Sequence, residues 1–121
     1  MRVRLSKTSP VDFCLFERRV RLWLIRLGLT DWCIQFRHSK KKTDYRALVS
    51  YDTKEREAVF TLSVCWGTST ISHGEINLVA LHEVLHLLLA DLTDLLPSNK
   101  KSIVLEHATM RRLEYALLGR Q

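Results

Sequence analysis

Residues 75–92, EINLVALHEVLHLLLADL, decide the fold, because this stretch is apolar on nearly every side except one strip. That strip carries His82, Glu83 and His86. In an α-helix, residues four apart lie on the same face, so both imidazoles point the same way. A helix this apolar belongs inside a domain. Burying these three groups without partners would cost about 1–3 kcal/mol per group, so we expect something to coordinate them.

The spacing His82-Glu83-x-x-His86 is the H-E-x-x-H pattern, in which two histidines bind zinc and the glutamate acts as general base. The flanks agree, with Val79 three residues before the first histidine and uncharged residues between the glutamate and the second histidine. Here the chain resembles the zincin metallopeptidases, and its small size resembles the minimal zincin domains of phages and prophages. The resemblance covers residues 75–118. It implies a zinc-dependent hydrolase of peptide bonds, with both histidines as ligands.

The resemblance also suggests a third zinc ligand. Glu106 lies 20 residues after His86, and gluzincins of the thermolysin type place their glutamate ligand at a similar distance, on the helix after the motif. Those enzymes also have an acidic residue four positions after that glutamate and an asparagine just before it, where this chain has Met110 and Leu105. We expect Glu106 to bind the metal. His107 is the alternative, because consecutive helical residues point about 100° apart and one of the two faces the metal.

The same resemblance assigns roles to other groups. Glu83 is expected to take a proton from the zinc-activated water and return it to the leaving amine. An extended peptide or protein substrate is expected to pair with an exposed edge strand at residues 58–63. Asp91 and main-chain carbonyls are candidates to orient the ligand imidazoles. The candidates to stabilise the oxyanion are His107, Arg111 and Tyr115.

Composition limits the remaining possibilities. A chain of 121 residues with 46% hydrophobic content suits one domain over residues 1–121. The net charge of +6 and the lysines at residues 40–42 leave a metal-dependent hydrolase of nucleic acid as an alternative. Another alternative is a zinc-stabilised binding or regulatory domain that has lost activity. We expect a cytoplasmic protein without a membrane partner, because no signal-like or membrane-spanning apolar run is present. The sequence leaves the oligomeric state open.

The remaining pattern predicts an α+β domain of order α-β-β-β-α-α. Ser9 and Pro10 begin a helix that Gly28 can end. Apolar and polar residues then alternate in three segments joined by short polar connections, which predicts a three-stranded antiparallel sheet. These segments are residues 32–37, 45–51 and 58–63. Ser72 caps the H-E-x-x-H helix, and Ser98 or Asn99 caps a last helix that reaches Leu118.

Overall fold

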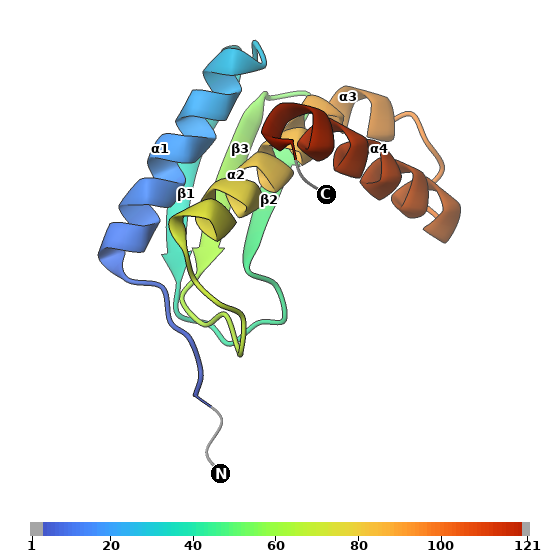
Figure 1. The fold of residues 1–121 in the computed structure, drawn as a ribbon. Coiled ribbons are helices and arrows are strands. Elements are labelled where there is room, and N and C mark those ends of the chain that lie inside the picture. The colour runs from blue at the N-terminus through green and yellow to red at the C-terminus, as the bar shows by residue number, and fades with distance from the viewer. Residues whose placement is uncertain (1–3, 120–121) are drawn as a thin grey trace.

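The computed structural model describes residues 4–119 as a three-stranded sheet with its helices on one face (Figure 1). The elements are α1 (Pro10–Arg26), β1 (Cys33–Ser39), β2 (Ala47–Asp52), β3 (Glu57–Ser63), α2 (His73–Leu88), α3 (Ala90–Thr93) and α4 (Lys100–Leu118). This arrangement confirms the predicted α+β layout, and the short α3 is added where we expected only a bend. Within residues 4–119, no helix has both the length and the apolar character that crossing a membrane requires.

Local sequence signals set the helix ends as expected. The hydroxyl of Ser9 accepts a hydrogen bond from a backbone N–H in the first turn of α1, and Ser72 does the same for α2, each at 3.1 Å. The side chain of Asn99 accepts at 3.0 Å from the first turn of α4. Gly28 and Gly119 follow α1 and α4 with φ of 74° and 69°, a left-handed conformation that costs glycine little.

The sheet is mixed and not antiparallel, which corrects the sequence prediction. The strand order is β1-β3-β2, with β2 antiparallel and β1 parallel to β3. Residues 40–46 carry the chain from the end of β1 past β3 to the start of β2. Residues 58–63, expected at an exposed edge, therefore lie in the central strand. The physical reason is burial, because Ala58, Phe60 and Leu62 are at most 2% exposed.

Helix α2 lies at the centre of the packing. Its residues Ile76, Leu81 and Leu85 are fully buried, and α2 packs against α1, β2 and α4. The indole N–H of Trp23 in α1 donates to the side chain of Asn77 in α2 at 3.1 Å. By contrast, α4 packs mainly against α2. The position of α4 therefore depends chiefly on what α2 presents to it.

We predict that Phe60→Ala lowers the free energy of unfolding by about 3–5 kcal/mol, because it removes a fully buried ring from the central strand and leaves a cavity. Urea denaturation followed by circular dichroism measures the change. Leu95→Ala is the matched control, since Leu95 is 82% exposed and its removal should change stability by less than about 0.5 kcal/mol. Equal effects of the two substitutions would contradict the central position of β3.

Candidate metal centre

Three histidines come together between α2 and α4. The rings of His82 and His86 lie 5.0 Å apart, centroid to centroid, as the spacing of four residues along α2 predicts. The ring of His107, from α4, lies 5.8 Å from that of His82 and 5.2 Å from that of His86. One ring nitrogen from each histidine lies within 4.8 Å of the other two. All three side chains are half-buried.

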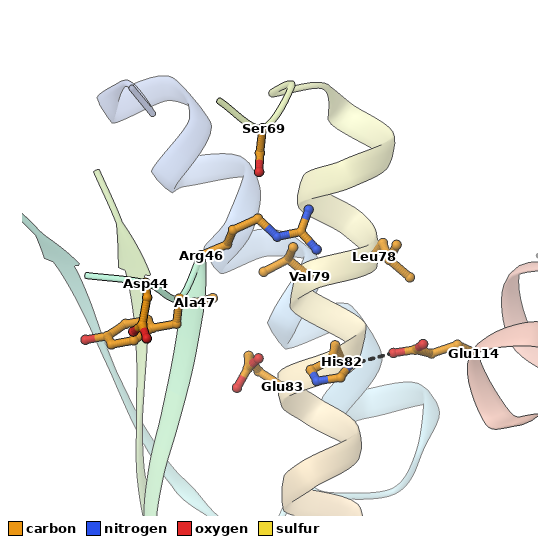
Figure 2. Close-up of a pocket in the computed structure, with 10 residues that line it drawn as sticks. Asp44, Arg46, Ala47, Ser69, Leu78, Val79, His82, Glu83 and Glu114 are labelled. Carbon is orange, nitrogen blue, oxygen red and sulfur yellow. Dashed lines mark hydrogen bonds and ion pairs between the residues drawn. The ribbon is translucent and has the colours of Figure 1, made fainter. Parts of the chain in front are cut away.

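Carboxylates from α4 orient the two histidines of α2. The Nδ1–H of His82 donates to Glu114 at 2.8 Å, as Figure 2 shows. The Nδ1–H of His86 donates to Glu106 at 2.9 Å. A metal-binding histidine usually has its other ring nitrogen bonded to a carboxylate or a backbone carbonyl, which fixes the ring and increases its basicity. Both imidazoles are therefore held with Nε2 available.

His107 has the same arrangement, because its Nδ1–H donates to the backbone carbonyl of Ile103 at 2.9 Å. The geometry thus places His107 with the motif histidines. Glu106, expected as the third ligand, instead accepts the hydrogen bond from Nδ1–H of His86. Asp91, expected to orient a ligand, instead pairs with Arg56 at 2.8 Å and is exposed.

Three carboxyl groups lie near the cluster, those of Glu83, Glu106 and Glu114, and among the described residues none of them pairs with a lysine or arginine. Glu83 and Glu114 are 6% and 8% exposed, and the Glu106 side chain is 14% exposed. Burial raises the pKa of Glu83 to about 8, and the nearby charges of Glu114 and Glu106 add to this effect, while a backbone hydrogen bond from Val49 opposes it. A cation beside these three carboxyl groups would favour their ionised forms.

This positive charge does not come readily from protonation of the histidines themselves, as the pKa of His86 indicates. Burial lowers the pKa of His86, and the neighbouring His82 and His107 lower it further, while Glu106 partly opposes the effect. Imidazolium at all three positions would place like charges on adjacent rings. A divalent metal ion instead uses neutral imidazoles as ligands and favours the carboxylate form of Glu83. The three imidazoles and the carboxylates bonded to two of them are therefore compatible with a bound divalent metal ion.

An open cleft of about 450 Å³ borders the cluster. It is lined by Asp44, Tyr45, Arg46, Ala47, Ser69, Leu78, Val79, His82, Glu83 and Glu114. Figure 2 shows Glu83 on the side of α2 that faces β2, and His82 directed toward α4. The cleft therefore gives a molecule from solvent access to both the motif histidine and the motif glutamate.

The structure also separates the candidates for stabilising an oxyanion. Arg111 and Tyr115 are exposed and do not line this cleft, whereas His107 belongs to the histidine cluster. The role of Glu114 was missed in the sequence. Its spacing was a usable signal, because Glu114 lies seven residues after His107 and so on the same face of α4 two turns later.

Comparisons with known protein families, curated proteins and solved structures found no match. The case for a function therefore depends on the sequence motif and on the geometry of these side chains.

We predict that the purified protein binds one zinc ion per chain and that His107→Ala weakens zinc binding by more than about 100-fold, because it removes one of three ligands. Glu106→Gln should weaken binding only about 10–100-fold, the usual effect of losing the hydrogen-bond partner of a ligand. Competition with a chromophoric chelator measures both affinities.

His73→Ala is the matched control, since His73 is an exposed residue at the first position of α2 and should not affect zinc binding. If Glu106→Gln abolished zinc binding while His107→Ala retained it, the ligand set would be His82, His86 and Glu106, as the resemblance to gluzincins first suggested.

Bound zinc should also stabilise the fold. A ligand that binds only the folded state at 100 times its Kd adds about 2.7 kcal/mol, so we expect zinc to raise the midpoint of thermal unfolding by on the order of 10 °C. Differential scanning calorimetry with zinc and after chelation measures this shift. The His107→Ala protein should show almost none of it, and an equal shift in that variant would place the zinc elsewhere.

Proposed function

We propose that this protein is a zinc-dependent peptidase whose metal ion is held by Nε2 of His82, His86 and His107. The observation that carries the proposal is the orientation of the three imidazoles. Each donates its Nδ1–H to a protein oxygen, which leaves Nε2 for a metal, and one ring nitrogen of each histidine lies within 4.8 Å of the other two. Three protein ligands with one open coordination position are typical of catalytic zinc, whereas structural zinc usually has four protein ligands.

Glu83 is the proposed general base. When bound, zinc supplies a Lewis acid that polarises a carbonyl and lowers the pKa of water toward about 7. Glu83 follows His82 in the helix and lines the same cleft, which supports its carboxylate as the acceptor of the proton from the attacking water. It then passes the proton to the departing amine.

The open edge of β2 supports a peptide as the substrate. β2 pairs with β3 along one edge only, and Ala47 at its start lines the cleft together with His82 and Glu83. An extended peptide can add to such an edge through main-chain hydrogen bonds, which would hold its carbonyl groups along the cleft. The proposed substrate-binding strand is therefore β2, in place of the residues 58–63 first expected.

A zinc-stabilised domain without activity is the main competing function. It shares the three histidines but gives no role to a carboxylate in position 83. Burying Glu83 near Glu106 and Glu114 costs free energy, and an inactive domain offers no function that would explain it. The catalytic function explains the histidines, the glutamate and the open cleft together.

We predict that Glu83→Gln retains zinc and slows peptide cleavage by at least about 100-fold, because glutamine fills the same space but accepts no proton. Mass spectrometry of a peptide library treated with zinc-loaded protein identifies cleaved sequences, and a fluorogenic version of one such peptide then gives the rates. Glu55→Gln, in the exposed turn before β3, is the matched control and should cleave at the parental rate.

Cleavage by Glu83→Gln at the parental rate would rule out the general-base role. Zinc binding without cleavage of any library peptide by the parent protein would instead support the inactive, zinc-stabilised domain.

A further inference from the structure

The face of the sheet opposite the helices is open and carries its own cleft. All the helices lie on the other face (Figure 1). The strand register places residues of neighbouring strands in rows across this face. One such row places Arg37 of β1 beside Thr61 of β3 and Leu48 of β2, following the strand register. The cleft has a volume of about 670 Å³. It is lined by Arg37, His38, Ser39, Lys41, Tyr45, Leu48, Ser50, Val59 and Thr61.

The charge of this cleft has one sign. Its lining contains the cations Arg37 and Lys41 and no carboxylate. Neither cation forms an ion pair with any residue in the described range 4–119, whereas Arg46 and Arg56 elsewhere are paired with acids. Lys40 and Lys42 beside them are also exposed. The surface at this end of the sheet is therefore positive and suited to anions. The net charge of +6 does not by itself show where on the molecule the positive charge lies.

The uncharged part of the lining favours a particular kind of anion. The hydroxyls of Ser39, Ser50 and Thr61 can donate hydrogen bonds to phosphate oxygens. The ring of Tyr45 supplies a flat surface in this lining, and Leu48 supplies an apolar one. Surfaces that bind single-stranded nucleic acid combine cations along the backbone path with aromatic rings on which bases stack.

We propose that this open face binds single-stranded nucleic acid, with phosphates at Arg37 and Lys41 and a base stacked on Tyr45. The inference is independent of the peptidase function, since none of the three histidines of the metal centre lies in this cleft. Tyr45 lines both this cleft and the one beside His82 and Glu83, so the two binding surfaces meet at the start of β2. A single-stranded nucleic acid bound on the open face would lie next to any peptide in the proposed catalytic cleft.

Fluorescence anisotropy with a labelled 20-nucleotide oligothymidylate tests the proposal. The double variant Arg37→Glu, Lys41→Glu should bind at least tenfold more weakly than the parent. The slope of its log affinity against log salt concentration should be about 1.4 less steep than that of the parent, because two phosphate contacts are lost and each contributes about 0.7 on a single strand. The matched control reverses two exposed cations of α4, Lys101→Glu and Arg112→Glu, and should bind within twofold of the parent.

Tyr45 provides the test of stacking. Tyr45→Ala should weaken binding at least about fivefold, whereas Tyr45→Phe should retain it, because phenylalanine keeps a flat ring. Circular dichroism confirms that each variant is folded, and the double variant with glutamine at positions 37 and 41 repeats the charge test without adding acids. Equal weakening by the sheet and α4 double variants would overturn the proposal. Displacement of the oligonucleotide by polyglutamate at equal charge concentration would also overturn it, because the face would then bind anions without regard to bases.

Discussion

The burial of polar groups on α2 is the constraint on which the rest of the structure depends. Helix α2 is surrounded by α1, the sheet and α4, yet it carries two imidazoles and a carboxylate. Groups of this kind lose more on leaving water than most single hydrogen bonds return, so each needs a partner. Glu106, His107 and Glu114 of α4 provide partners or neighbours for both imidazoles. The polar strip of α2 thus packs against the polar face of α4.

These polar contacts help to explain the position of α4, although α4 buries few apolar side chains. Within α4, only Met110 and Glu114 are buried, and Ile103, Val104 and Leu105 are all more than half exposed. Met110, Leu113 and Leu118 pack with the core, and the polar contacts at the histidine cluster add to what joins α4 to α2. Because a metal ion there would bridge α2 and α4, metal binding and the docking of α4 are expected to be linked in free energy.

The sequence predicted the features that local chemistry determines. The helix caps at Ser9 and Ser72 and the shared face of His82 and His86 follow from spacing along one chain segment. For α4 the sequence offered Ser98 or Asn99, and Asn99 is the cap. Strand order does not follow from such spacing. The segment 40–46 is short and polar, so it resembled a hairpin turn, and only the deep burial of β3 shows why that strand is central. In the same way, the choice between Glu106 and His107 depends on how α4 crosses α2, and this crossing is a tertiary property.

The zinc-edge anomalous diffraction of crystals grown with zinc tests the central claim most directly. The account predicts a single strong anomalous peak at about 2.0–2.1 Å from Nε2 of His82, His86 and His107, with Glu106 and Glu114 still bonded to the Nδ1 atoms behind two of these rings. A peak coordinated by a carboxylate oxygen of Glu106, with the His107 ring turned away, would contradict this ligand set. The absence of any peak between α2 and α4 would contradict the metal centre itself.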